Sequence, residues 1–399
     1  MYLTREEEKM LDGEYGEGLA KCMRLLVVLG EIFEAEKMVR VKSCHVSGVS
    51  YKNIGEPGLE LLKSFAMENV RVKVKKTTLN PSGMDRKKWR RMGLPENFVQ
   101  KQTEILKAFK RVGVNLTCSC TPYLAGNKPK PGDYVAWSES SATVYVNSVL
   151  GARTNRESGL SALASAITGR TPYYGYLLDE NRKPNVKVKV KFKPSNVVEA
   201  GGLGYLIGKI FPERVPFFSG LGFMDFDWLK ALGAGLASSG AVTLYHVENL
   251  TPEAKLFDGK CLAEAEKFEV EREDVKKAVE DLSEAEERFD AVFLGCPHYS
   301  LNQLKDVAYF LRGRKVKAKL WVFTSRSVYV KAKGLGYVGL IEKAGGLVLC
   351  DTCMVVSPLE NLGLECVCTD SCKAAHYLPS TNRVKVKVKS PFECLEAIS

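Results

Sequence analysis

The stretch "DAVFLGCPHYS" (residues 290–300) carries an apolar run into a cysteine, a proline and a histidine. A helical periodicity then covers 301–312, followed by the apolar run "KVKAKLWVFTS" (315–325), a second helical pattern over 328–345 and the run "LVLCDTC" (347–353). Short apolar runs that alternate with helical patterns indicate βαβ units and a parallel sheet. The last third of the chain therefore predicts an α/β fold.

The preceding part shows the same alternation to about residue 180. The start "TREEEKMLDG" carries a capping-box pattern, Thr4 followed three residues later by Glu7. Further on, the sequence predicts strands at 41–47 and 70–78 and helices at 59–68 and 97–112. From 195 it turns small and Gly-rich, and 251–290 is highly charged and predicted to be helical. We expect several α/β domains with mostly parallel sheets, divided into residues 1–195, 196–290 and 291–399.

Two Gly-rich stretches, "GGLGYLIGK" (201–209) and "GAGLASSGAV" (233–242), resemble phosphate-binding loops only loosely. Neither matches the P-loop or the full dinucleotide-binding pattern. Close packing between helices explains them better.

Cysteines stand where the strands of the last third end. Ligands of parallel sheets bind beyond the carboxyl ends of the strands, so Cys296, Ser325 and Cys353 are expected at one rim. A cysteine in this position can be core filler, a redox thiol or a metal ligand. The C-x-x-C of Cys350 and Cys353 can likewise be a thioredoxin-like pair, half of a zinc site or two core residues, and the strand ends favour a shared metal centre.

The chain holds twelve cysteines, which suits a reduced cytosolic protein better than a disulfide framework. Cys350, Cys353, Cys366 and Cys368 could bind one zinc ion together. That is the alternative from a different class: a zinc-stabilised protein whose basic strands contact nucleic acid.

The net charge of +11 comes largely from three alternating runs, "VRVKVKK" (70–76), "VKVKVKFK" (186–193) and "RVKVKVK" (383–389). Alternation at period two places the valines on one face of a strand and the lysines on the other. A solvated strand face explains this pattern better than nucleic-acid binding. The chain has neither a signal-peptide pattern nor an apolar run long enough to span a membrane, so we expect a cytoplasmic protein that binds neither a membrane nor nucleic acid.

Short polar side chains gather in three loops that follow predicted strands: 43–58, 77–85 and 117–157. Hydroxyl and amide groups at this density suit a site for an oxygen-rich ligand, and an arginine can bind a carboxylate or a phosphate with two hydrogen bonds. The substrate-binding candidates are Gly55, Glu56, Asn80, Ser82, Ser140, Ser141, Asn147, Arg153 and Thr154.

Nine motifs distributed over nearly the whole chain resemble the large subunit of the aconitase X family. They are "LTREEEKMLDGEYGEG", "SCHVSGVSYKNIGEPG", "TTLNPSGMD", "CTPY", "AWSESSATVYVNSVLGARTNRE", "ITGRTPYYGY", "GCPHYS", "DTCMVVSP" and "AAHYLPS". The resemblance implies an aconitase-like core around a central cleft with a [4Fe–4S] cluster, and a hydro-lyase activity. In such an enzyme, an iron without a protein ligand acts as a Lewis acid on the leaving hydroxyl.

Carried over residue by residue, the resemblance assigns Cys120, Cys296 and Cys353 as the cluster ligands, with Cys118 and Cys350 as neighbouring alternatives. It also makes His298 a candidate to donate to a cluster sulfide or to the substrate.

The proton-abstracting base of this superfamily is a serine on a swivelling domain. Since "SPFECLEAIS" ends the chain at Ser399, the resemblance implies a separate small subunit that carries this domain, and a chain inactive alone. The two-subunit forms dehydrate (R)-5-phosphomevalonate to trans-anhydromevalonate 5-phosphate in the archaeal mevalonate pathway, and the fused forms resemble cis-3-hydroxy-L-proline dehydratases. The first substrate is expected here, with Arg153, Lys52 and Lys209 as phosphate-binding candidates.

Overall fold

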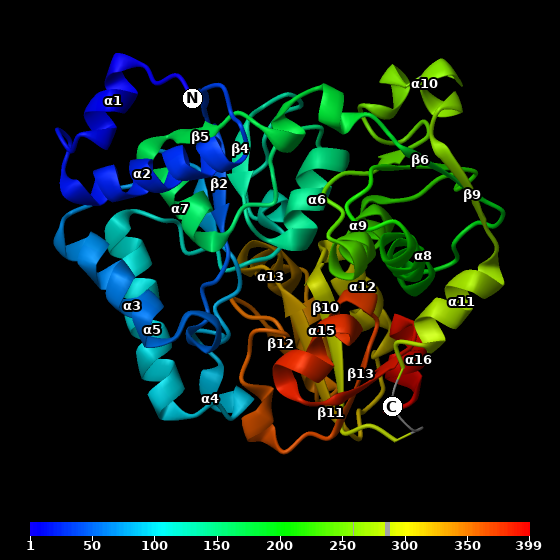
Figure 1. Cartoon of the computed structure of the whole chain (residues 1–399). Helices are drawn as coiled ribbons and strands as arrows, with labels where there is room; N and C mark the ends of the chain where they lie inside the picture. The colour runs from blue at the N-terminus through cyan, green and yellow to red at the C-terminus, as the bar shows by residue number, and fades with distance from the viewer. Residues whose placement is uncertain (258, 284–287) are drawn as a thin grey trace.

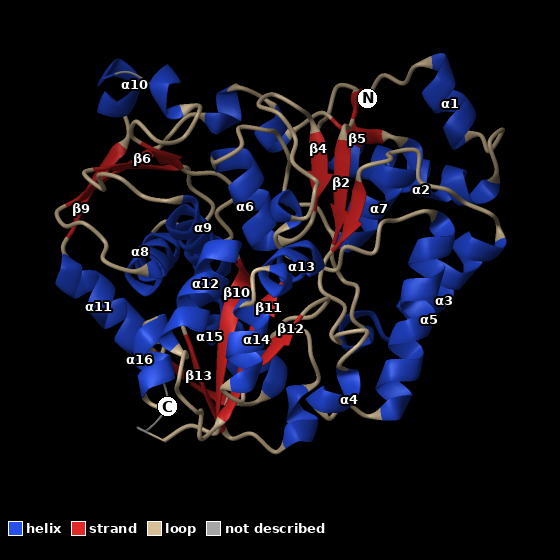
Figure 2. Cartoon of the chain, turned by 180° about the vertical axis from the view of Figure 1, so that it is seen from behind, coloured by secondary structure: helices blue, strands red, loops and turns tan. Residues whose placement is uncertain are grey.

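A computed structural model describes residues 1–257, 259–283 and 288–399. Three sheets of parallel strands form three parts, arranged around a common centre (Figures 1 and 2). This confirms the prediction of an α/β fold with mostly parallel sheets. The proposed boundaries near 195 and 290 stay a prediction.

The first sheet has the strand order β3-β2-β4 and all its strands are parallel. They are β2 (Ser43–Val46), β3 (Thr77–Leu79) and β4 (Val135–Trp137). A small antiparallel pair joins β1 (Met38–Arg40) to β5 (Arg170–Pro172). The helices of this part are α1 (Arg5–Leu11), α2 (Glu17–Ile32), α3 (Tyr51–Met67), α4 (Trp89–Met92), α5 (Glu96–Val112), α6 (Ser140–Ser148) and α7 (Gly159–Thr168). The predicted capping box of Thr4 and Glu7 starts α1.

The second sheet has the order β8-β7-β6-β9 and is also parallel. Its strands are β6 (Val186–Val190), β7 (Pro216–Ser219), β8 (His246–Val247) and β9 (Glu266–Val270), and its helices are α8 (Val197–Ile210), α9 (Phe226–Gly240), α10 (Gly259–Ala263) and α11 (Arg272–Glu280). Helices α8 and α9 touch backbone to backbone: a Cβ added to Gly235 would lie 2.1 Å from the carbonyl oxygen of Gly201. Close helix packing therefore explains the two Gly-rich stretches, as predicted.

The third sheet has the order β12-β11-β10-β13-β14 and is parallel throughout. Its strands are β10 (Ala291–Tyr299), β11 (Lys319–Thr324), β12 (Leu347–Leu349), β13 (Cys366–Thr369) and β14 (Lys385–Val388). The helices α12 (Leu301–Phe310), α13 (Arg326–Gly334), α14 (Tyr337–Lys343), α15 (Cys372–Asn382) and α16 (Pro391–Glu396) accompany them. The predicted βαβαβ arrangement is confirmed.

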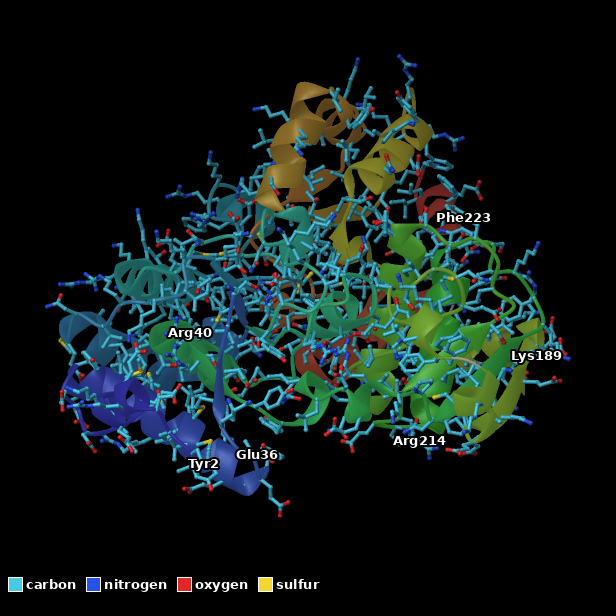
Figure 3. The ribbon with its side chains drawn as sticks, turned by 90° about the horizontal axis from the view of Figure 1, so that it is seen from above. Tyr2, Glu36, Arg40, Lys189, Arg214 and Phe223 are labelled. Atoms are coloured by element: carbon cyan, nitrogen blue, oxygen red, sulfur yellow. The ribbon has the colours of Figure 1, made fainter. Side chains whose placement is uncertain are left out.

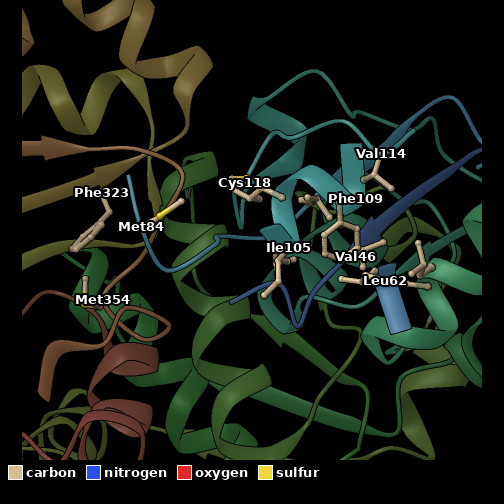
Figure 4. Packing of buried hydrophobic residues seen from close by; sticks show 14 of the residues in the cluster. Val46, Leu62, Met84, Ile105, Phe109, Val114, Cys118, Phe323 and Met354 are labelled. Carbon is tan, nitrogen blue, oxygen red and sulfur yellow. The ribbon is translucent and has the colours of Figure 1, made fainter. Parts of the chain in front are cut away.

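The first and third sheets point their carboxyl ends at each other. In Figure 1 the strands β2 and β4 run downward and β10 to β12 run upward, and Figure 2 shows the same from behind. One hydrophobic cluster extends from one part into the other: Ile105 and Phe109 of the first part belong to it, and so do Phe323 and Met354 of the third, which lie on the other side of the view in Figure 4. The buried residues between the two sets of strand ends are therefore held in a shared core.

Three sequence predictions differ from the structure. Residues 70–76 do not form a strand; Val74 is buried as the alternation requires, but its N–H bonds to the Ala166 carbonyl outside a ladder. The charged stretch 251–290 contains the strand β9, which lies at a sheet edge, where charged side chains are common. Residues 258 and 284–287 of this stretch lie outside the described part of the chain. The helix predicted over 328–345 is two helices, because Gly336 stands between them with a φ of 82°.

Of the two other alternating runs, 186–193 forms the interior strand β6 and 383–389 the edge strand β14. In both strands the valines are buried and most lysines are solvated. No helix in the described part of the chain has the length and apolar character that a membrane crossing requires.

Candidate active site

The three cysteines assigned from the resemblance lie together between the facing strand ends. Cys120 ends a segment that runs beside β3, where the Ser119 N–H bonds to the Leu79 carbonyl at 2.9 Å. Cys296 lies at the irregular end of β10, and Cys353 follows β12. Burial raises the pKa of the Cys120 thiol, and the neighbouring Cys353 and Cys296 sulfurs raise it further, so the three thiols are close enough to interact electrostatically.

Each of the three sulfurs also has a neighbour that favours its thiolate. The backbone N–H of His298 donates to the Cys120 Sγ at 3.2 Å. Burial raises the pKa of Cys353, while the backbone N–H groups of residues 356 and 355 lower it. Burial likewise raises the pKa of Cys296 to about 12, and the Lys373 ammonium lowers it. Since metals bind the thiolate, these contacts suit ligation.

A buried ion pair lies beside the cysteines and joins the two sheets. Lys373, at the start of α15, donates from Nζ to the Glu139 carboxylate and to the Ser141 Oγ at 3.0 Å. Glu139 follows β4 and caps α6, accepting from the Ala142 N–H. Burial is the largest single influence and works against both charges, but Lys373 together with the Ala142 N–H and the Ser141 hydroxyl lowers the pKa of Glu139, and Glu139 together with the Cys296 and Cys120 sulfurs raises that of Lys373. Both residues therefore remain charged.

His298 is fully buried and binds three segments of the chain. Its Nε2 lies 2.7 Å from the Thr352 carbonyl and its Nδ1 3.0 Å from the Ser119 Oγ. The carbonyl can only accept, so Nε2 carries the proton and Nδ1 accepts from the serine hydroxyl. Burial lowers the pKa of His298 to about 4. Both ring nitrogens of His298 therefore make hydrogen bonds to protein groups, and its backbone N–H is the group that reaches a cysteine. The predicted donation from the ring to a sulfide or to the substrate does not fit this arrangement.

His45 and Asn80 carry buried polar atoms without partners. The His45 Nδ1 lies 3.0 Å from the Thr78 Oγ1, whereas its Nε2 has no hydrogen-bond partner in the described part of the chain. The Asn80 side chain lies close enough to this ring to raise the pKa of His45 as a weak hydrogen-bonding neighbour, but its Oδ1 makes no hydrogen bond of good geometry among the described residues. Burial lowers the pKa of His45 to about 4, and the Glu139 carboxylate acts in the opposite direction. Burying a polar atom without a hydrogen bond costs free energy, so the space beside His45 and Asn80 is suited to a bound polar group.

Three predicted substrate residues have structural partners instead. Asn147 and Thr154 bind each other through side chain and backbone: the Asn147 Nδ2 donates to the Thr154 carbonyl at 2.9 Å, and its Oδ1 accepts from the Thr154 N–H at 3.0 Å. The Arg153 guanidinium donates to the Leu177 carbonyl and the Asp179 carboxylate. All three thus fix the loop after α6, so the prediction that they face the ligand does not fit the structure.

The remaining substrate-binding candidates have different structural roles: one interrupts a helix, one forms a surface ion pair, and others contact the buried Glu139. Gly55 has a φ of 57° and interrupts α3, and the half-exposed Glu56 pairs with Lys101. The Ser82 Oγ donates to the Asp351 carbonyl at 2.9 Å. Ser140 and Ser141 both contact Glu139 and therefore belong to the site. Of the phosphate-binding candidates, Lys52 is bound to Glu360 and Asn382, and Lys209 is exposed on α8.

The neighbouring cysteines lie elsewhere. Cys118 is fully buried in the core (Figure 4), near an ion-pair cluster in which Arg86 and Arg326 bind Asp351. The same Arg326 lies near Cys350 and is the charged group that lowers the pKa of its thiol most, against the larger effect of burial. The assignment of Cys120 and Cys353 as ligands in place of Cys118 and Cys350 stays a prediction.

The four-cysteine zinc site is not formed. Cys353 faces Cys120, while the Cys368 sulfur lies 3.2 Å from that of Cys394. Across the described ranges, no three cysteine, histidine or carboxylate side chains are gathered around a point where one ion could bind. The four cysteines of the zinc-stabilised alternative are therefore not brought together in the structure.

Sequence reasoning missed Lys373 and His45 and did not select Glu139. Glu139 lies in the polar loop 117–157, where the surrounding hydroxyl and amide side chains give it no distinguishing pattern. Lys373 follows β13 and His45 lies near the end of β2, so the rule that placed the cysteines at carboxyl ends would have found both.

Models of known protein families match almost the whole chain. Models of the first, second and third domains of aconitase X match residues 1–180, 184–280 and 289–399. The chain therefore belongs to the aconitase X family.

Individual members of the family are similar to this chain over most of its length. A protein from Methanocaldococcus jannaschii named phosphomevalonate dehydratase large subunit is 50% identical over 95% of this chain and 96% of its own length. The crystal structure of Thermococcus kodakaraensis aconitase X in its holo form superposes with a TM-score of 0.93, at 41% identity and full coverage of both chains. A cis-3-hydroxy-L-proline dehydratase from Pseudomonas aeruginosa is 32% identical over 98% of this chain and 69% of its own length.

Proposed function

We propose that this chain is the cluster-bearing large subunit of a hydro-lyase that dehydrates (R)-5-phosphomevalonate to trans-anhydromevalonate 5-phosphate. The observation that carries the proposal is the set of relatives named phosphomevalonate dehydratase large subunit, which are 36–50% identical over at least 95% of the chain. The hydroxyproline dehydratases are more distant, at 30–32% identity. Dehydration of a hydroxyproline is the second candidate.

A [4Fe–4S] cluster fits the residues present. The three thiols of Cys120, Cys296 and Cys353 interact, each has a thiolate-favouring neighbour, and the described residues gather no set of ligands around a single ion. Cysteine thiolates are the usual protein ligands of iron–sulfur clusters. When bound, the cluster would supply a Lewis-acidic iron for the departing hydroxyl.

The chain's own side chains bind and orient. Lys373 remains protonated because Glu139 raises its pKa, so it supplies positive charge to anionic groups and does not act as the base. Ser141 orients its ammonium from one side. His298 fixes the segments that carry Cys120 and Cys353, through Ser119 and Thr352. We infer that it positions the ligands and does not contact the substrate.

Of the predicted substrate-binding residues we retain Asn80, Ser140 and Ser141 and add His45. The unpaired Oδ1 of Asn80 and Nε2 of His45 supply one donor or acceptor each for a hydroxyl or a carboxylate. A serine on the small swivelling-domain subunit is proposed as the base, because the relatives carry the name large subunit. The active species would then be a heterodimer or a larger assembly of both subunits.

The test is anaerobic co-expression with the small subunit, followed by mass-spectrometric assay on both substrates. Formation of trans-anhydromevalonate 5-phosphate supports the proposal, whereas turnover of cis-3-hydroxy-L-proline alone would select the second candidate. Iron and sulfide analysis of the large subunit tests the cluster separately, with about four of each expected per chain. Cys118→Ala is the matched control for Cys120→Ala, because Cys118 is a buried neighbour outside the site.

A further inference from the structure

A strongly basic groove lies at the opposite end of the first sheet from the cysteines. It encloses about 600 Å³ and is lined by residues from separate segments of the chain. Its cationic side chains are Arg40, Lys42, Lys73, Lys75, Lys76, Lys128, Lys130 and Arg170, against the carboxylates of Glu6 and Asp133. Arg40 is labelled in Figure 3, which looks down on this end of the molecule.

The topology of the sheet explains why the charges converge. Lys42 directly precedes β2, Lys76 directly precedes β3, and the loop with Lys128 and Lys130 leads into β4. Parallel strands begin at the same edge, so these segments, far apart in sequence, meet there. The active-site residues lie at the other edge: His45 is near the carboxyl end of β2 and Glu139 follows β4. The groove is thus separate from the active site.

The two carboxylates of the groove are already engaged. Glu6 accepts from Arg170 at 2.9 Å and lies 3.6 Å from Arg40, and Asp133 accepts from the Lys130 backbone N–H at 2.8 Å. The six lysines are all exposed, and within the described chain none has a carboxylate within 4.0 Å. Lys73 lies against the Tyr15 ring, a contact that leaves its charge unneutralised.

Eight cationic side chains against two carboxylates leave the groove with a net positive charge, and like charges held together repel one another and attract anions. The groove has the size of a small-molecule site, for which ~300–1,000 Å³ is typical. Among the described residues that line it none is aromatic, so it offers no surface on which a nucleobase could stack. Lysines bind phosphate groups as point charges and need no fixed fork geometry.

We propose that this groove binds a compact polyphosphate anion, a ligand with two or more linked phosphate groups and no required base. The site is distinct from the one that would hold the phosphate of the substrate. The proposal does not depend on the proposed dehydratase activity.

The experiment is a calorimetric titration of the full chain with inorganic tripolyphosphate at low salt. The wild-type chain is expected to bind one tripolyphosphate per chain. Lys75→Gln/Lys128→Gln removes two charges that come from different segments, and affinity is expected to fall about tenfold. The control Lys107→Gln/Lys110→Gln removes two exposed lysines of α5 that do not line the groove, and it should bind as the wild type does.

Three results would overturn the proposal. The first is absence of saturable binding, and the second is an equal loss of affinity in both double variants, which would indicate delocalised surface charge. The third is tighter, groove-dependent binding of a single-stranded RNA oligomer, which would make the ligand a nucleic acid. Without polyphosphate, dehydratase activity of Lys75→Gln/Lys128→Gln should equal that of the wild type, so failure here and failure of the proposed function are distinguishable.

Discussion

The buried pair of Glu139 and Lys373 offers the sharpest test of the site. Lys373→Met replaces the ammonium by an apolar group of similar length, and it leaves the Glu139 carboxylate, 6% exposed in its side chain, with only the Ala142 N–H and nearby hydroxyl groups. Removing one partner of a buried ion pair typically costs about 3–5 kcal/mol, because the remaining charge is uncompensated. We expect a loss of this size in the free energy of unfolding at pH 7.

The double variant Glu139→Gln/Lys373→Met removes both charges and serves as the internal control. Replacing a buried pair by neutral groups is often nearly neutral, so we expect it to recover much of the stability lost in Lys373→Met. Guanidinium denaturation of the four chains, followed by circular dichroism, gives the coupling energy of the pair. If Lys373→Met unfolds within about 0.5 kcal/mol of the wild type, the two charges are not a buried pair and our account of the site is wrong.

The pH dependence of the same pair has a definite sign. Burial alone would raise the pKa of Glu139, but Lys373 lowers it below the ordinary value. A carboxyl group with a lowered folded pKa contributes its stability above the unfolded pKa and loses it as the pH falls through the folded pKa. The stability difference between wild type and Lys373→Met should therefore shrink below about pH 4.

Four further outcomes follow from the structure. Cys120→Ala, Cys296→Ala and Cys353→Ala should each lose the visible absorption and iron of the cluster, whereas Cys350→Ala, near Arg326, should retain both; a colourless Cys350→Ala would show that the ligands are misassigned. His45→Phe should lower activity at least about tenfold while iron content is unchanged, because His45 is not one of the three proposed cluster ligands and its Nε2 makes no hydrogen bond of good geometry within the described chain; full activity would place the substrate elsewhere. Burial raises the pKa of Asp370 to about 6, so it should cost stability as the pH rises from about 4 to 6, and Asp370→Asn should remove that part of the pH profile in denaturant titrations. Gly235→Ala would place its Cβ 2.1 Å from the Gly201 carbonyl oxygen, and we expect it to separate α8 from α9 at a cost of about 1–3 kcal/mol; a midpoint of thermal unfolding equal to that of the wild type would contradict the close contact.

The sequence determined the fold better than the orientation of individual side chains. Apolar runs between helical patterns located β10, β11 and β12, because a buried parallel strand requires an unbroken hydrophobic run. The same reasoning failed at 70–76, where the valines are buried but no neighbouring strand completes a ladder, and at β9, where charge at a sheet edge concealed the strand.

The residues of the candidate site also differ in how well the sequence predicted their positions. Family motifs and strand ends indicated the three proposed ligand cysteines, whereas Arg153, Asn147 and Thr154 were chosen because they lie in a polar stretch that is also a family motif. Their partners, such as Asp179, lie in later segments, and sequence does not reveal which polar residue a loop uses for its own hydrogen bonds. Lys373 was missed for the complementary reason: its partner Glu139 is 234 residues away, and only the folded chain brings them together.

That long-range pair has a consequence for how the chain would tolerate being cut. The ion pair and the hydrophobic cluster join residues before 168 directly to residues after 290, without passing through the second sheet. A backbone break between β9 and β10 would therefore leave two fragments that still share a buried interface. Such fragments, expressed separately, should therefore reassociate through the buried ion pair and the shared hydrophobic cluster.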